Sequence, residues 1–293
     1  MPVINIQFTL FSAFYSPLIM VMAGGFLREE GYDHNWSVAP PGKSAMDALV
    51  DGSADVIQTA VIQGVNDLEN GRTPAALNFA LVNAMDGFFI TARNPHDNFS
   101  WDSLEGSELV TFPGGQPNYM LRYACLKAGI DYSRIQPVTP GGPDQIDAAF
   151  RAGQGQFVHQ QGPYPQQLEA EGLGHVVARC GPLIGRCAFS TLAAKPEWLD
   201  SDAARAFQRA YRNAMAHLAT APVDTVVDTI VSWFDDTDRE ALSRCIAAYQ
   251  ALGCWSPDVD ITQQDYDATL DVFEHAGKLT TRHAFTDLCW SPD

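Results

Sequence analysis

The sequence predicts an α/β fold with a helical C-terminal part, and three patterns along the chain carry this prediction. Over residues 3–59, extended apolar runs alternate with helix-like segments in the order strand–helix–strand–helix–strand. The same alternation returns over residues 108–171. From residue 201 onward, apolar side chains fall at helical spacing instead. A chain of 293 residues is long enough for one large domain or for two domains of ordinary size.

The first unit places Gly, Ser and Pro where each predicted strand meets its helix. An apolar run ends in the cluster SAFYSP at residues 12–17, and a helix-like segment then closes at residues 24–25. The segment PPGKS at residues 40–44 opens a short helix that ends at residues 51–52, and a third extended run follows. In such α/β sheets, ligands bind beyond the carboxyl ends of the strands. We therefore look for a binding site in these loops.

The rest of the chain predicts a second lobe inserted into the first. Two extended runs, 75–82 and 88–91, lie on either side of a first crossing near residue 86, and the run 184–191 forms the return crossing. We expect one lobe from residues 1–88 and 190–293, and a second from residues 89–189. The elements expected within the second lobe are strands at 108–112, 135–139 and 156–160, and helices at 118–128, 144–153 and 166–171.

Composition narrows the class of partner and the compartment. The net charge is −17 and the chain has only four lysines, so it lacks the clustered cations that nucleic acid or an anionic membrane surface would need. No apolar run reaches the roughly 20 residues that span a bilayer. The apolar N-terminal stretch carries no Lys or Arg before Arg28 and is typical of a strand plus a helix. We expect a cytoplasmic protein as the sequence stands, or a periplasmic one if a leader has been removed.

The six cysteines show no Cys-x-x-Cys pair, and no His/Cys grouping has zinc spacing. We expect mainly buried free thiols. Cys180 and Cys187 are the best candidates for a bridge in an oxidising compartment. The sequence predicts neither a metal nor a cofactor.

Five motifs appear in the order that one family uses. They are GFLREEGYD (25–33), KSAMDALVDGSADV (43–56), WDSLEG (101–106), GGQP (114–117) and DQIDAAFRAGQ (144–154). On these motifs the chain resembles the type II periplasmic solute-binding proteins, in the group that binds nitrate, sulfonates, taurine and thiamine-pyrimidine precursors. The resemblance covers about two thirds of the chain and implies a two-lobed fold that closes at a hinge. It also implies a small-molecule ligand and an ABC transporter permease as partner, but not which ligand.

Three glycine-rich turns open predicted helices and expose backbone N–H groups. They are Gly42-Lys43-Ser44, Gly114-Gly115-Gln116 and Gly141-Gly142. Glycine allows close backbone approach, and a helix N-terminus carries partial positive charge, so such turns can cradle an anion or a carbonyl oxygen. Alternatively, these turns only start helices. The order in which they occur favours a binding role for the first two.

Further candidates stand near the ends of the predicted strands and at the crossings. Aromatic rings after the first strand could stack on a flat ligand, amides at the strand ends could bind polar groups, and Asp86 at the first crossing could accept from a ligand amine. Arg186 could supply a cation or pair with Asp86. The predicted ligand-binding set is Phe14, Tyr15, Ser16, Lys43, Ser44, Thr59, Gln63, Asp86, Gly114, Gly115, Gln116, His159, Gln160, Gln161 and Arg186.

Two functions remain open. One is a solute-binding protein that closes on a small polar organic solute, such as a sulfonate, a carboxylate or a pyrimidine-like molecule. The other is a cytoplasmic enzyme on the same fold that acts on an aromatic acid or a heterocycle. A pyrimidine-precursor synthase of this fold carries Lys and His where Thr59 and Gln63 stand here, and no nucleophile stands in a convincing context. The sequence favours the binder and predicts no catalytic residue, with His159 as the one candidate base.

Overall fold

A computed structural model describes residues 1–40 and 43–291 as two five-stranded mixed sheets covered by helices. The first sheet has the strand order β2-β1-β3-β10-β4. Its β1, β2 and β3 run parallel, whereas β10 is antiparallel to both of its neighbours. Its strands are β1 (Val3–Phe8), β2 (Asp33–Val38), β3 (Val56–Thr59), β4 (Leu77–Asn83) and β10 (Ser190–Ala194).

The second sheet has the strand order β7-β6-β8-β5-β9. Here β7, β6 and β8 are parallel, and β5 pairs antiparallel with β8 and β9. Its strands are β5 (Phe88–Ala92), β6 (Glu108–Val110), β7 (Gln136–Val138), β8 (Phe157–Gln161) and β9 (His175–Arg179). The sequence pattern did not predict β9, because this short edge strand is only half-buried and lacks a clear apolar alternation.

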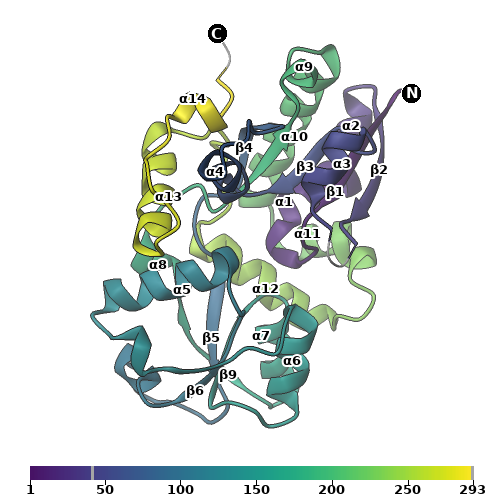
Figure 1. The fold of residues 1–293 in the computed structure, drawn as a ribbon. Coiled ribbons are helices and arrows are strands. Elements are labelled where there is room, and N and C mark those ends of the chain that lie inside the picture. Colours follow the sequence, from purple (N-terminus) through teal and green to yellow (C-terminus); the bar gives the residue numbers. More distant parts are fainter. Residues whose placement is uncertain (41–42, 292–293) are drawn as a thin grey trace.

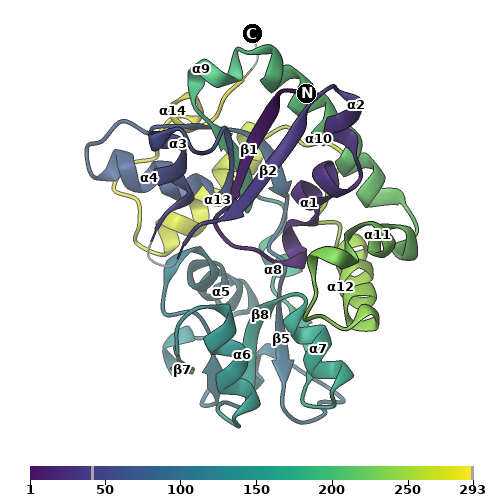
Figure 2. The ribbon, with the colours of Figure 1, turned by 90° about the vertical axis from the view of Figure 1, so that its right-hand side faces the viewer.

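The two sheets lie one above the other, each with its own helices, as Figure 1 shows. Figure 2 gives the same arrangement from the side, with both chain ends in the upper lobe. The chain passes between the sheets between β4 and β5, and again between β9 and β10. The two-lobed α/β architecture predicted from the sequence is confirmed.

Helices of the upper lobe begin at the turns that follow its strands. Ser44 caps the helix after β2: its hydroxyl accepts from the Met46 N–H, while the Asp47 carboxylate accepts from the Ser44 N–H. Such a reciprocal cap satisfies two backbone donors that the helix leaves free. The helical segments of this region are η1 (Ala13–Tyr15), α1 (Ser16–Ala23), α2 (Phe26–Glu29), α3 (Ala45–Asp51) and α4 (Val61–Glu69).

The lower lobe follows the same strand–turn–helix pattern. Gly129 ends its longest helix in the left-handed conformation, at φ 76°, which glycine adopts without the steric cost of a Cβ. The helical segments are η2 (Trp101–Leu104), α5 (Gly115–Ala128), η3 (Tyr132–Arg134), α6 (Pro143–Arg151), α7 (Tyr164–Ala170) and α8 (Gly181–Ile184).

The C-terminal helices contact both lobes. Helix α12 packs on α7 below and on η1 above, and α13 packs on α5. In Figure 1 these two helices lie at the level where the lobes meet. The helical segments of this part are α9 (Pro196–Leu199), α10 (Asp202–Thr220), α11 (Val223–Ile230), η4 (Val231–Trp233), α12 (Arg239–Leu252), α13 (Gln263–His275) and α14 (Phe285–Leu288). Within the described residues, no helix has the length and apolarity that crossing a bilayer requires.

Candidate ligand-binding pocket

A cavity of about 210 Å³ lies between the two lobes. The upper wall comes from the ends of β1 and β3, from η1 and α4 and from the start of β10, and the lower wall comes from the starts of β5 and α5 and from the end of β8. The cavity is lined by Thr9, Leu10, Tyr15, Gln58, Thr59, Ala60, Ile62, Gln63, Asn66, Phe88, Gly115, Gln116, Pro117, Tyr119, Gln161, Phe189 and Ser190. This is the edge at which ligands bind in α/β sheets.

The upper wall is ordered by Gln58, the second-last residue of β3. Its Oε1 accepts from the backbone N–H groups of Thr9 and Leu10, at 3.2 and 3.3 Å. The Thr9 hydroxyl in turn donates to the Gln58 carbonyl oxygen at 2.6 Å. The loop after β1 is thereby tied to the end of β3, which fixes the wall before any ligand enters.

Tyr15 and Gln63 bring further polar groups to the upper wall. The Tyr15 side chain is almost fully buried, and burial together with the nearby Asp86 carboxyl raises the pKa of its hydroxyl, so the phenol stays protonated. Gln63 lies in the first turn of α4, and Asn66 follows three residues later on the same face of the helix. Both amides can reach a ligand from this helix.

The lower wall carries two amides from separate elements. Gln116 lies in the first turn of α5, and its Nε2 donates to the Phe189 carbonyl oxygen. Gln161 is the last residue of β8, paired with Phe88 of β5. The side chains of Gln116 and Gln161 are only 8% and 2% exposed.

Three atoms of these two amides lack partners. The Oε1 of Gln116 and both the Oε1 and Nε2 of Gln161 are buried without a hydrogen bond to any residue that the structure describes. Leaving a buried polar atom unpaired costs about 1–3 kcal/mol. A ligand in the adjacent cavity could recover this cost.

The pocket wall holds no charged side chain among the described residues. Aromatic rings of Tyr15, Phe88, Tyr119 and Phe189 supply its apolar surface. No Cys, Lys, His or carboxylate among the described residues lines the cavity, so the only titratable side chains on this part of the wall are those of Tyr15 and Tyr119. This wall can bind and orient a solute, but it offers no obvious nucleophile.

Of the residues predicted for the site, Tyr15, Thr59, Gln63, Gly115, Gln116 and Gln161 line this cavity. Phe14 and Ser16, by contrast, lie in the core of the upper lobe. The Phe14 ring packs on Tyr249 and Phe189 with centroid distances of 5.0 and 5.3 Å. Ser16 is fully buried, and its hydroxyl donates to the Ala13 carbonyl oxygen at 2.7 Å. Neither can contact a ligand in the cavity.

The turns with the predicted anion cradles also lie mostly outside the cavity. Ser44 uses its hydroxyl and its N–H in the cap of α3, and Lys43 is exposed. Gly42, the first residue of that turn, lies outside the described residues. Gly114 caps α5 but is not part of the wall, and the Gly141-Gly142 turn opens α6 elsewhere on the lower lobe. Only Gly115 and Gln116 of these three turns line the cavity.

His159 and Gln160 precede Gln161 on β8 but do not reach the cavity. The His159 ring is fully buried against Phe88, with centroids 4.6 Å apart, and its Nδ1 is 3.2 Å from the Thr111 hydroxyl oxygen. Burial lowers the pKa of His159 to about 3, so the imidazole stays neutral. Gln160 points to the other face of the sheet, where its Nε2 donates to Asp147 at 3.4 Å.

Asp86 lies buried in the first connection between the sheets. Its Oδ1 accepts from the Phe88 N–H at 2.8 Å, while its Oδ2 has no partner among the described residues. Burial raises the pKa of this carboxyl to about 7. The Asp86 side chain does not line the cavity and belongs to the connection between the two sheets.

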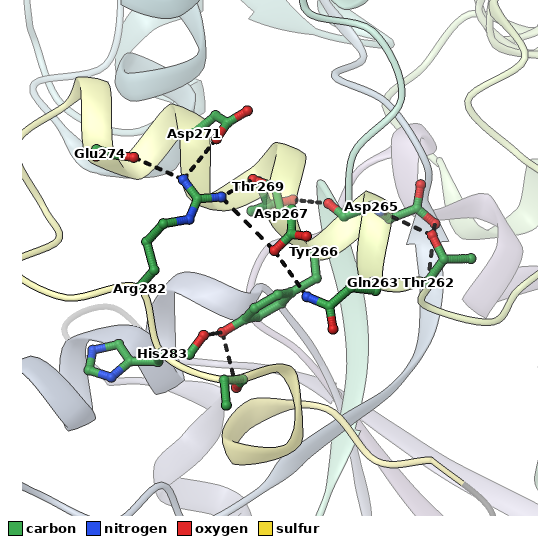
Figure 3. A network of polar contacts seen from close by, with 11 residues as sticks. Thr262, Gln263, Asp265, Tyr266, Asp267, Thr269, Asp271, Glu274, Arg282 and His283 are labelled. Atoms are coloured by element: carbon green, nitrogen blue, oxygen red, sulfur yellow. Dashed lines mark hydrogen bonds and ion pairs between the residues drawn. The ribbon is translucent and has the colours of Figure 1, made fainter.

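Arg186 pairs with Asp265, not with Asp86. Its Nε and Nη2 donate to the two Asp265 carboxylate oxygens at 2.7 and 3.2 Å. Asp265 also accepts from the Thr262 hydroxyl and N–H in the cap of α13, as Figure 3 shows at the start of that helix. The arginine therefore ties the return crossing to the C-terminal helices and is not available to a ligand.

Residues that the sequence reasoning missed come from segments distant in the chain or from an unpredicted helix. Phe88, Tyr119 and Phe189 read as ordinary core aromatics in the sequence. Asn66 could have been found from Gln63 by its helical spacing of three, had α4 been recognised.

The six cysteines are free and buried. No group of acidic, His or Cys side chains in residues 1–40 and 43–291 is arranged to hold a metal ion.

Comparison with known proteins assigns the class. Residues 9–225 match the NMT1-like family, so this chain belongs to that family. Among curated proteins it is similar to YtlA of Bacillus subtilis (strain 168), whose name proposes a binding protein. The two are 27% identical over 281 residues, which cover 94% of this chain and 84% of YtlA.

Solved structures share the fold. The alkanesulfonate-binding protein SsuA from Xanthomonas axonopodis pv. citri, bound to MOPS, superposes with a TM-score of 0.76 at 17% identity, covering 99% of this chain and 98% of SsuA. The ligand-binding component of an ABC-type import system from Staphylococcus aureus gives 0.76 at 18% identity, covering 99% and 97%. The predicted periplasmic-binding-protein fold is thereby confirmed.

Proposed function

We propose that this chain is a solute-binding protein that closes on a small polar organic solute and delivers it to an ABC-type importer. The observation that carries the proposal is a cavity whose walls come from both lobes. A ligand that contacts both walls stabilises the closed arrangement relative to the open one, and this difference is what drives hinge closure. The relatives named above, a binding protein and the ligand-binding component of an importer, support this function.

The proposal includes the division of the chain into lobes. One lobe consists of residues 1–88 and 190–293, and the other of residues 89–189, with hinges near Asp86 and Gly185. Gly185 has φ 88°, a conformation that glycine adopts easily. A function in import also places the protein on the outer side of the cytoplasmic membrane, where the importer collects its solute.

The test combines a ligand screen with a measurement of shape. Thermal shift against sulfonates, carboxylates, amides and pyrimidines identifies ligands, because a ligand at 100 times its Kd adds about 2.7 kcal/mol to the stability. Small-angle X-ray scattering then compares the chain with and without the best ligand. We expect a smaller radius of gyration in the bound state. Binding with an unchanged radius, or chemical turnover of the ligand followed by mass spectrometry, would contradict the proposal and favour an enzyme.

A further inference from the structure

The pocket offers an anion little compensation for the water it would lose. Its wall carries no cationic side chain among the described residues. Two helix N-termini face the cavity, those of α4 and α5, and each supplies only partial positive charge. In the first turn of α5, Pro117 has no N–H, so this turn has one donor fewer for an anion. Burying an unpaired charge costs far more than burying a paired polar group.

The orientation of the Gln116 amide is fixed by its neighbour. The Phe189 carbonyl oxygen can only accept, so the amide nitrogen must face it, and Oε1 must be the free atom. Gln116 therefore presents an acceptor that requires a donor. Gln161 presents one donor and one acceptor whichever way its amide is turned, because both of its atoms are unpartnered.

An acceptor-only ligand such as nitrate, a sulfonate or a carboxylate leaves the free oxygens of Gln116 and Gln161 unpaired. A ligand that carries a carbonyl-type acceptor and two N–H donors, as a primary carboxamide or a urea does, can pair with all three free atoms. The aromatic side chains of the wall also suit a flat and uncharged molecule. With about 210 Å³, the cavity is smaller than most ligand sites, so the molecule must be small.

We propose that the pocket selects an uncharged solute bearing a primary carboxamide or urea edge, and that Gln161 and Gln116 are the residues that determine this specificity. This inference rests on the proposed binding function. The inference goes beyond that function because it states which residues on the wall distinguish between ligands of the same shape but different charge.

The test uses pairs of ligands matched in shape. Benzamide and benzoate, and nicotinamide and nicotinate, differ in the donor and the charge but hardly in size. Isothermal titration calorimetry at pH 7.5 should show that each amide binds at least tenfold more tightly than its carboxylate. Methanesulfonate and nitrate should bind no better than the carboxylates.

A pair of variants locates the selecting group. Gln161→Met should weaken amide binding by about 10- to 100-fold, the loss expected when a buried hydrogen-bonding partner is removed. Gln160→Met is the matched control, since Gln160 lies next to it on β8 but faces away from the cavity, and it should bind as the native chain does. Circular dichroism and thermal unfolding establish that both variants are folded. The ligand pairs on the native chain test the specificity independently of the variants.

The outcomes separate this inference from the proposed function. Tighter binding of the anions, or no binding by any amide, overturns the uncharged class while leaving a solute-binding protein intact. Equal effects of Gln161→Met and Gln160→Met overturn the role of Gln161. If ligands of either charge bind without bringing the lobes together in solution scattering, the proposed function of a protein that closes on its solute fails.

Discussion

Replacing Asp86 by Asn should stabilise the protein at neutral and alkaline pH. This carboxyl is fully buried, and only one of its oxygens has a partner, the Phe88 N–H at 2.8 Å. The Asn side chain keeps an oxygen in that position and has nearly the same shape. The substitution also replaces the unpartnered oxygen by an NH2 group, but the cost of that group does not depend on pH, so the pH-dependent part of the change isolates the cost of a buried negative charge.

The magnitude follows from the pKa, which burial raises from 3.8 to about 7 in the folded protein. Below pH 3.8 the carboxyl is protonated in both the folded and the unfolded state and has no effect. As the pH rises toward 7, the unfolded chain releases the proton while the folded protein retains it, so stability falls. Above pH 7 the loss levels off at about 4 kcal/mol, since each pKa unit corresponds to about 1.36 kcal/mol.

Urea unfolding of the native chain and of Asp86→Asn at pH 5 and pH 8 measures this effect. The variant should gain stability over the native chain, and the gain should grow by about 2–3 kcal/mol from pH 5 to pH 8. Burial raises the pKa of the neighbouring Tyr15, Cys180, Cys187 and Cys254, so all four stay neutral over this range. His159 titrates in the unfolded chain of both proteins and cancels in the comparison. A gain that is independent of pH would refute the argument.

Two further comparisons test the packing around the hinge. Arg186→Gln leaves the buried Asp265 carboxylate without its cation and should cost about 3 kcal/mol in urea unfolding, reduced from the fully buried case because the arginine side chain is 42% exposed. Arg282→Gln breaks exposed ion pairs to Asp271 and Glu274 of α13, the helix that also holds Asp265 (Figure 3), and should cost less than about 1 kcal/mol. Similar costs for the two arginine variants would contradict this reasoning. Gly87→Ala places a Cβ 2.1 Å from a buried phenylalanine ring and should cost about 1–3 kcal/mol. Gly114→Ala meets no atom within 4 Å and should be almost neutral, so equal thermal shifts for the two glycine variants would show that the crowding is relieved at little cost.

Local patterns in the sequence were sufficient where a strand, its turn and its helix are adjacent in the chain. The cap at Ser44 depends on contacts within a few residues, and it lies in the turn where the sequence predicts that a helix begins. Helix α4 and strand β9 were missed. Strand β9 is only half-buried and lacks an apolar alternation, so its sequence carries no local strand signal, and it forms a strand by pairing with β5, more than 80 residues away.

The candidate site shows the same division. Tyr15, Thr59, Gln63, Gly115, Gln116 and Gln161 end strands or begin helices, and this position together with their residue types made them candidates. Phe14 and His159 stand at equally suitable positions in the sequence, but their rings face the core. Whether a side chain at a strand end points to the cavity or into the core depends on the twist of the sheet and on what packs beneath it.

The sequence by itself determined the alternation of strands and helices, the helical C-terminal part and the family, because these depend on residue order and on short-range propensity. The tertiary structure alone decided that Arg186 binds Asp265, 79 residues away, and that Gln161 faces the cavity while Gln160 faces Asp147. It also decided that the cavity wall is uncharged, since this requires bringing together side chains from residue 9 to residue 190. The physical reason is that a pocket between two lobes is built from contacts distant in the chain, whose partners are chosen by packing and burial and not by local sequence.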